Sequence, residues 1–262
     1  MLSLWYSTIY TDGLDPASHF PRERYKLVRD GLETARETGV LQFHEPSPLA
    51  TEELLLAHDS KYVNAFLSGS LNKEAKRRIG LRPWTDDIVK RTLILANGTI
   101  EATRHILNHG GISGNVGGGT HHAYRAFGSG YCIFNDLALA ARIAQRDFGI
   151  NNVLILDLDV HQGDGTAAIF ESDPTVRTVS LHCVKNFPSR KMHSDLDVPF
   201  EPETKDEEYL NTLDSVLNKE RKKHLLKVNK NTFVHRQVIS NVRTNGSYAK
   251  PRGTTQVIGP AQ

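Results

Sequence analysis

Acidic residues are nearly missing from the end of this 262-residue chain. After Asp214 there is no aspartate, and after Glu220 there is no acidic residue of any kind. Residues 219–262 carry ten Lys or Arg against one Glu, a net charge of +9, whereas residues 1–218 carry 22 against 29, a net charge of −7. The overall charge of +2 describes neither part, and this asymmetry predicts that the two parts differ in character.

Cysteine is scarce, and long apolar runs are missing. The two cysteines, Cys132 and Cys183, do not make a disulfide scaffold, which fits a reducing compartment. No apolar run approaches the roughly 20 residues that a membrane span needs. The apolar residues 2–10 follow no basic segment, and no Arg/Ser-rich transit peptide is visible, so we expect neither secretion nor membrane contact. The cytoplasm and the nucleus both fit, and an organelle is left open.

The rest of the composition is that of a folded protein, and its periodicity favours an α/β fold. Hydrophobic residues make up 39% of the chain, which is enough for a buried core and excludes wholesale disorder. Apolar spacing of three and four predicts helices, and short apolar runs predict strands. The helices are expected at 22–38, 51–67, 86–108, 136–148, 165–171 and 209–224, and the strands at 153–158 and 176–181. Their alternation predicts βαβ units and a parallel sheet.

The last part of the chain lacks such periodicity. Beyond about residue 225 we find no sustained period of 2 or 3.6. We therefore predict one domain over residues 1–217 and a basic, poorly ordered tail over residues 218–262. The tail has few aromatic residues on which bases could stack, so a solvated charge run is favoured over a weak nucleic-acid contact.

The segment DLDVHQGDG (157–165) follows the most apolar strand of the chain. On an extended strand Asp157, Asp159 and His161 share one face, and ligands of parallel sheets bind at the carboxyl ends of the strands. Burying three such groups without partners costs several kcal/mol, and a metal removes that cost. Carboxylate and imidazole suit Zn²⁺, although a catalytic zinc takes three protein ligands. The alternative is a strand-end aspartate that caps the next helix beside a hydrogen-bonded histidine.

Two adjacent histidines, His121 and His122, follow three glycines in GGGTHH (117–122). The glycines predict a tight turn that brings the backbone close to another group. A histidine whose second ring nitrogen is hydrogen-bonded to an aspartate has a shifted pKa and can act as a general acid or base. Asp157 and Asp164 are available for this, so the two clusters together favour a catalytic site over isolated surface histidines.

At this point the sequence resembles the histone deacetylase family. The resemblance covers about residues 1–213, and its motifs occur in the same order as in the family. It is closest to class IV and related bacterial deacetylase-like proteins, because HQGDG has Gln in place of a second His. It implies a three-layer α/β fold of the arginase/deacetylase type, with a parallel sheet flanked by helices and incomplete at the C-terminus. The motifs that carry it are HFPRERYKLVRDGL (19–32), GGGTHHA (117–123), GSGYCIFNDLALAA (128–141), LILDLDVHQGDGTAAIF (154–170) and VSLHC (179–183).

The resemblance also implies a catalytic role for each residue of the two clusters. Asp159 and His161 would be two of three zinc ligands. The tandem histidines would activate a zinc-bound water and pass its proton to the leaving amine. In this scheme Asp157 orients His121, and Asp164 orients His122.

Further site residues follow from the same resemblance. Asp157, Ser180 and the backbone of Leu181 would help bind a structural K⁺. Gly130 and Tyr131 would line the tunnel for the acyl-lysine. Cys132 would lie beside them as a buried residue and not as a nucleophile.

Two functional residues of the family are missing from the sequence. The third zinc ligand, an Asp in a D-x-G-x-D segment, and the catalytic Tyr of a GGGY-type loop both have no match. The one late tyrosine, Tyr248, lies in NGSY, which is a weak match. The resemblance ends near 213–217, where the charge changes, so the sequence predicts a truncated isoform or altered reading frame with little or no deacetylase activity.

Three functions are therefore weighed. The first is a zinc-dependent lysine deacetylase acting on acetylated protein, with a role in chromatin regulation, impaired in this chain. The second is a deacetylase of acetylpolyamines or other small amides. The third is a non-catalytic regulatory or binding isoform.

His58 and His182 are expected to be packing or hydrogen-bonding histidines and not metal ligands.

Overall fold

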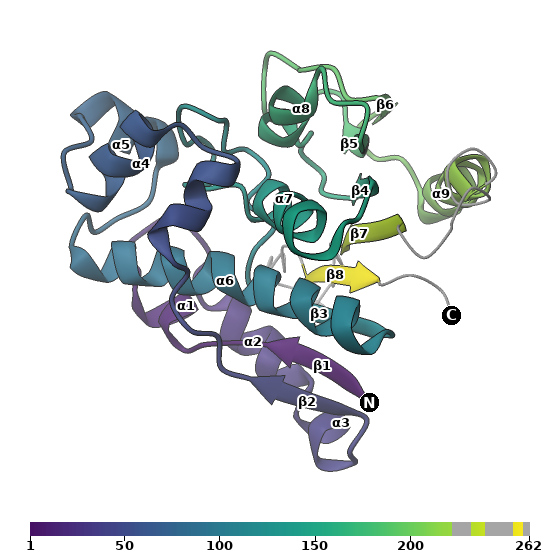
Figure 1. The fold of residues 1–262 in the computed structure, drawn as a ribbon. Coiled ribbons are helices and arrows are strands. Elements are labelled where there is room, and N and C mark those ends of the chain that lie inside the picture. The colour runs from purple at the N-terminus through teal and green to yellow at the C-terminus, as the bar shows by residue number, and fades with distance from the viewer. Residues whose placement is uncertain (222–231, 239–253, 259–262) are drawn as a thin grey trace.

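The computed structural model describes residues 1–221 and the backbone of residues 232–238 and 254–258. Over these ranges the strands form one eight-stranded sheet in the order β2-β1-β3-β8-β7-β4-β5-β6 (Figure 1). The strands are β1 (Leu2–Trp5), β2 (Leu41–His44), β3 (Ile112–Asn115), β4 (Asn152–Asp157), β5 (Val176–Cys183), β6 (Leu196–Phe200), β7 (Thr232–Val238) and β8 (Thr254–Ile258).

Strand direction is parallel through most of the sheet. β1 pairs in parallel with β2 and β3, and β4 pairs in parallel with β5 and β7. β5 pairs in parallel with β6. β8 runs antiparallel to both of its neighbours, β3 and β7, so the sheet is mixed at its centre. The register places Asp157, the last residue of β4, opposite Ser180 of β5.

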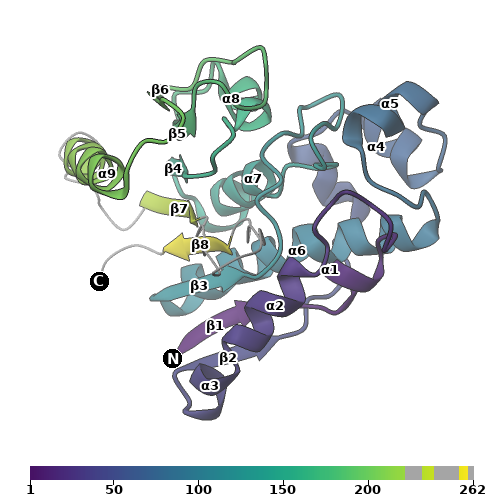
Figure 2. The same ribbon diagram turned by 180° about the vertical axis from the view of Figure 1, so that it is seen from behind.

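Helices cover both faces of the sheet, which makes three layers (Figures 1 and 2). α6 and α7 pack on one face, and α9 packs on the other through Leu213 and Val216. The helices are α1 (Ile9–Asp12), α2 (Arg24–Gly31), α3 (Glu33–Glu37), the 3₁₀ helix η1 (Thr51–Leu56), α4 (Ser60–Leu67), α5 (Lys73–Ile79), α6 (Asp86–His109), α7 (Asp136–Phe148), α8 (Asp164–Phe170) and α9 (Asp206–Glu220).

Strand β4 shows why the apolar run at 153–158 forms a buried central strand. Alternate residues enter opposite cores: Val153 and Ile155 pack in the core that contains α6 and α7. Leu154 and Leu156 pack in the core that contains residues of α9. A strand buried on both faces reads as continuously apolar, and this burial directs the polar residues after it to the sheet's carboxyl edge.

The structure confirms the predicted α/β fold with a parallel sheet between helices. It confirms the helices 86–108 and 136–148 almost to the residue, and it confirms both predicted strands. The predicted helix 22–38 is two helices, α2 and α3, and 51–67 is η1 followed by α4. The chain turns at Leu32 and again near Ala57, because neither residue has helical backbone angles.

Two strands, β7 and β8, lie beyond residue 225, where the sequence shows no sustained period. β7 and β8 lie between β3 and β4, where each hydrogen-bonds to the strands on both sides. Backbone pairing with strands already in place can order a segment that has no apolar period of its own. Residues 218–220 of the predicted tail belong to α9. From residue 222 on, the residues other than β7 and β8, Tyr248 among them, lie outside the described residues.

Candidate active site

The acidic side chains of the site come from the carboxyl end of β4 and the start of α8. Asp157 is the last residue of β4, and Asp164 is the first residue of α8. Each is 3% exposed. Gly163 must be small here, because a Cβ atom on it would lie 2.2 Å from Asp157 Oδ2. The motif DLDVHQGDG thus turns sharply away from the sheet and brings both carboxylates to one place.

The tandem histidines meet these two carboxylates. His121 Nδ1 lies 2.5 Å from Asp157 Oδ2, and His122 Nδ1 lies 2.6 Å from Asp164 Oδ1. The two imidazole rings are 4.0 Å apart between centroids, and both residues are buried. The two pairings that the family resemblance implies are therefore present. The catalytic roles of these residues stay predictions.

A buried carboxylate, Asp136, holds the glycine turn that carries the histidines. Its oxygens accept hydrogen bonds from the backbone N–H of Gly119 (3.0 Å) and of Thr120 (2.7 Å). They also accept from the Thr99 hydroxyl at 2.6 Å. Gly118 has φ of +87°, and a Cβ there would lie 2.4 Å from this carboxylate. The neighbouring Asn135 caps α7, so Asp136 is free to anchor the turn.

The two histidines differ in charge because their surroundings differ. Burial acts to lower the pKa of His121, but the Asp157 and Asp159 carboxylates outweigh it and raise this pKa to about 9. Burial and repulsion from His121 lower the pKa of His122 to about 4. At neutral pH the site therefore holds a protonated His121 next to a neutral His122, which is one proton donor beside one proton acceptor.

Tyr124 is a third partner of this network that the sequence does not reveal. Its hydroxyl donates to Asp164 Oδ2 at 2.8 Å, on the oxygen that His122 does not contact. The ring of Tyr124 stacks on Phe127 with 4.4 Å between centroids. The hydroxyl and the imidazole together fix the Asp164 carboxylate, and this orients His122.

Asp159 and His161, the two predicted zinc ligands, face one another. His161 Nδ1 lies 2.8 Å from Asp159 Oδ1, and the same oxygen accepts the backbone N–H of His161 at 2.7 Å. Burial acts to raise the pKa of Asp159, but His121 and His161 hold it well below its usual range. A catalytic zinc takes three protein ligands, and within residues 1–221 no group of three His, Cys, Asp or Glu side chains could hold a metal. The described residues therefore supply two donors and do not complete a zinc site.

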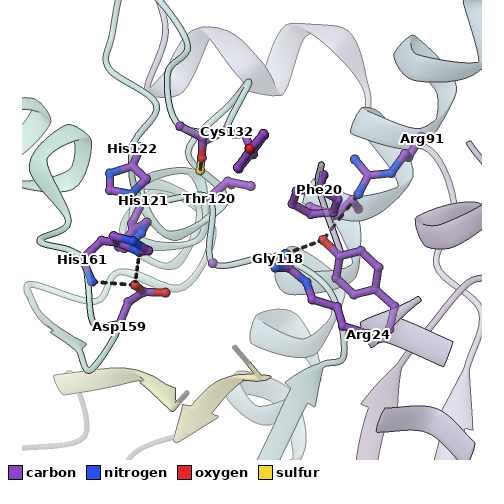
Figure 3. Close-up of a pocket in the computed structure, with 15 residues that line it drawn as sticks. Phe20, Arg24, Arg91, Gly118, Thr120, His121, His122, Cys132, Asp159 and His161 are labelled. Atoms are coloured by element: carbon purple, nitrogen blue, oxygen red, sulfur yellow. Dashed lines mark hydrogen bonds and ion pairs between the residues drawn. The ribbon is translucent and has the colours of Figure 1, made fainter. Parts of the chain in front are cut away.

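These groups form one wall of a pocket, and the opposite wall carries guanidinium groups (Figure 3). Arg24 and Arg91 both line the pocket, and each donates to the Tyr25 hydroxyl. Nε and Nη1 of Arg24 are buried without a hydrogen-bond partner among the described residues. The pocket thus lies between a histidine–carboxylate wall and a positively charged wall that includes Phe20.

The predicted tunnel residues lie at the same pocket. Gly130, Tyr131 and Cys132 line it, and Tyr131 has φ of +67°. Burial strongly raises the pKa of the Cys132 thiol, which keeps it protonated, as expected for a residue that is not a nucleophile.

Phe187 is an aromatic residue of this site that sequence reasoning missed. Its ring lies 4.7 Å from His122 and 6.2 Å from His161 between centroids. A Cβ on Gly130 would lie 3.0 Å from the Phe187 ring, so the ring and Gly130 are in close contact. In the sequence, the one signal for a functional Phe187 is its place next to Pro188 in the polar segment KNFPSRK.

The structure also shows the contacts of the predicted K⁺ ligands and of His58 and His182. Asp157 and Ser180 lie opposite each other in the β4–β5 register, next to Leu181. The Ser180 hydroxyl hydrogen-bonds to His182 Nδ1 at 3.1 Å. His58 contacts the Tyr124 carbonyl through Nδ1 and accepts the Asn135 N–H through Nε2. The interpretation of both histidines as hydrogen-bonding residues is confirmed.

The buried histidine–aspartate pairs lie at the carboxyl edge of a largely parallel α/β sheet, where proteins of this fold class bind their ligands. The sequence model of the histone deacetylase domain matches residues 18–225. Because this match covers most of the chain, the protein belongs to the histone deacetylase family. The match continues beyond residue 217, where the motif resemblance ends.

Three relatives illustrate the similarity. An uncharacterized protein of Picosynechococcus sp. is 44% identical over 211 residues, covering 79% of this chain and 69% of that protein. The acetoin utilization protein AcuC of Bacillus subtilis is 31% identical over 186 residues, covering 68% of this chain and 48% of AcuC. AcuC of Staphylococcus aureus is 29% identical over 211 residues, covering 73% and 54%. The chain thus spans about half the length of the AcuC proteins.

Within the described residues no helix is both long enough and apolar enough to cross a bilayer.

Proposed function

We propose that the pocket is the site of a deacetylase that hydrolyses the acetyl-lysine amide, and that turnover in this chain is weak or absent. The observation that carries the proposal is the pair of adjacent histidines, each on its own buried aspartate, beside Asp159 and His161. Family membership supports an acetylated amide as the substrate.

The histidine pair has the proton chemistry that amide hydrolysis requires. A water must lose a proton when it attacks the carbonyl, and the leaving amine must gain one. His122, neutral at pH 7, is suited to accept the first proton. His121, held protonated by two carboxylates, is suited to donate. The Asp157 and Asp164 carboxylates fix both rings with their second nitrogen toward the pocket.

Impairment follows from the groups that have no match in the sequence. A zinc bound by Asp159 and His161 alone has one protein ligand fewer than catalytic sites use, so we expect weak binding. The loss of one oxyanion donor lowers rates by about 10²–10³. We assign no catalytic step to the metal. Asp157, Ser180 and the Leu181 backbone stay the proposed K⁺ site.

The test compares an acetyl-lysine peptide with the same peptide lacking the acetyl group. We expect the purified full chain to bind the acetylated form more tightly by calorimetry, to hold well below one zinc per chain, and to hydrolyse the peptide barely above background. His122→Ala should remove that residual hydrolysis without weakening binding tenfold. Equal binding of both peptides would refute the substrate class. Fast, chelator-sensitive turnover would instead refute the impairment.

A further inference from the structure

Positive charge is concentrated on the segments around the pocket. Residues 73–82, 124–131 and 184–193 together contain nine Lys or Arg and a single acid, Glu74. Residues 1–218, to which these segments belong, have a net charge of −7. The rest of this part of the chain is therefore strongly acidic, and the basic residues are not spread evenly over it.

The first of these segments lies directly behind a pocket wall. The carbonyl of Ile79 accepts the backbone N–H of Tyr131 at 2.7 Å, and the carbonyl of Arg78 accepts that of Gly130 at 3.3 Å. A Cβ on Gly80 would lie 3.1 Å from the Tyr131 ring. The C-terminal end of α5, with Arg77 and Arg78, is thus fixed next to the residues that line the pocket.

The second segment follows the tandem histidines and is joined to the first. The guanidinium of Arg78 lies 4.5 Å from the centroid of the Phe127 ring, and its Nε donates to the Gly128 carbonyl at 3.2 Å. Arg125, three residues after His122, is exposed. The loop between the tandem histidines and Tyr131 therefore carries one cation, Arg125, and a second, Arg78 of α5, packs against it.

The third segment, on the connection between β5 and β6, lies against the pocket residues His122, His161 and Gly130 through Phe187. In both views α5 and this connection lie on opposite sides of the loops that join β3 to α7 (Figures 1 and 2). The connection carries Phe187, which contacts the rings of His122 and His161, and Arg190 follows three residues later. Burial raises the pKa of Tyr124, and the positive charge of Arg190 opposes this rise, which places Arg190 on the same side as the Tyr124 hydroxyl.

Most of these cations have no carboxylate to neutralise them. Lys185 pairs with Glu201 at 3.0 Å, and Arg82 pairs with Asp15 at 3.4 Å. Within residues 1–221 no ion pair involves Arg77, Arg78, Arg125 or Arg190. We call these four arginines the basic rim. Unpaired charges of one sign around an opening create a field that selects ligands by charge.

We propose that the basic rim selects acyl-lysine segments of proteins in which the flanking residues are acidic. This inference rests on the proposed function, because the pocket must admit the acyl-lysine itself. Opposite charge on the flanking residues speeds association and fixes register, whereas like charge is rejected. The rim therefore disfavours lysine- and arginine-rich tails such as those of histones, and it disfavours acetylated polyamines, which are cations.

Three peptides of equal length, with a central acetyl-lysine and acidic, neutral or basic flanks, test the proposal by fluorescence anisotropy. We expect the full chain to bind the acidic peptide at least about fivefold more tightly than the neutral one, and the basic peptide more weakly still. The difference should shrink at 300 mM salt because exposed charges are screened. Equal affinities, or a preference for basic flanks or acetylspermidine, would overturn it.

A charge-reversal variant locates the effect on the rim. Arg125→Glu/Arg190→Glu should remove or invert the preference, whereas Lys205→Glu, which changes an exposed lysine before α9, should leave it unchanged. Circular dichroism checks that both variants are folded. A preference that survives in the double variant would show that the rim is not the determinant.

Two further ligands in the same binding assay test the acetyl dependence and a nucleic-acid partner. The unacetylated acidic peptide should bind more weakly than the acetylated one; if it binds equally, the proposed function fails while the charge preference stands. A single-stranded oligonucleotide is the competing anionic partner. If it binds through the same arginines more tightly than the acidic peptide, the rim is a nucleic-acid surface and the proposal is wrong.

Discussion

Gln162 and Met192 are joined by two hydrogen bonds although 30 residues separate them. Gln162 Nε2 donates to the Met192 carbonyl at 2.7 Å, and its Oε1 accepts the Met192 N–H at 2.8 Å. Nε2 also donates to Asp197 Oδ1 at 2.8 Å. The Gln162 side chain, which follows His161 in the motif, therefore fastens the β5–β6 connection, which carries Phe187, to the segment DLDVHQGDG.

Gln162→Met should release this connection while keeping the volume of the buried side chain. The main chain of Met192 then loses its partners, and each lost hydrogen bond weakens the local structure by about 1 kcal/mol. We expect trypsin to cleave within residues 184–193, at Lys185, Arg190 or Lys191, about tenfold faster, because cleavage follows the population of the open form. Mass spectrometry of timed digests measures this rate.

Gln42→Met is the matched control for this measurement, because Gln42 is exposed on β2, away from the connection. It should leave the cleavage rate at 184–193 unchanged. Equal digestion of Gln162→Met and the unmodified chain would show that other contacts hold the loop, such as those from Lys191 Nζ to the Asn186 and Pro188 carbonyls.

The ion pair between Arg177 and Glu220 should contribute measurably to stability. Arg177 Nε and Nη2 donate to the two Glu220 oxygens at 2.5 and 3.0 Å, and Glu220 is 1% exposed. This contact ties the end of α9 to β5. Arg177→Met takes two charge-assisted hydrogen bonds from a buried carboxylate, so we expect urea unfolding to report a loss of about 2–3 kcal/mol.

A double variant separates the charge from the packing. Arg177→Met/Glu220→Leu removes the buried carboxylate together with its partner and should be more stable than Arg177→Met alone. If both variants unfold at the same urea concentration, the loss comes from packing of the Arg177 side chain and not from its ion pair with Glu220.

His58 should make the fold less stable as the pH falls. Burial lowers the pKa of His58 to about 4, below its ordinary value of 6.5. Because the unfolded chain takes up this proton first, the contribution is complete above pH 6.5 and is lost as the pH falls toward 4. The expected loss from this residue between pH 7 and pH 5 is about 2 kcal/mol.

The variant His58→Gln removes this titration. Its unfolding free energy at pH 7 should be lower, because His58 bridges the Tyr124 carbonyl and the Asn135 N–H. Between pH 7 and pH 5 its stability should fall by about 2 kcal/mol less than that of the unmodified chain. The unfolding free energy is measured by urea titration at each pH. If it falls equally with pH in the two proteins, the assignment of a neutral, buried His58 is wrong.

Much of the active-site segment could be predicted from residue order. The pairing of each tandem histidine with an aspartate follows from motif likeness, and both contacts are present. Helix α7 follows from its cap residue Asn135, its apolar spacing and Gly149 at its end. These signals are local, because helix periodicity and capping depend on residues a few positions apart.

By itself the sequence therefore determined the fold class, the two motifs and the charge break. Only the tertiary structure decided that Phe187 lies on His122, that Tyr124 shares Asp164, and that the end of α5 is hydrogen-bonded to Gly130 and Tyr131 of the pocket. It also decided that β7 and β8 pair between β3 and β4. Each of these contacts joins residues distant in the chain, and their formation depends on packing and backbone pairing that no local periodicity records.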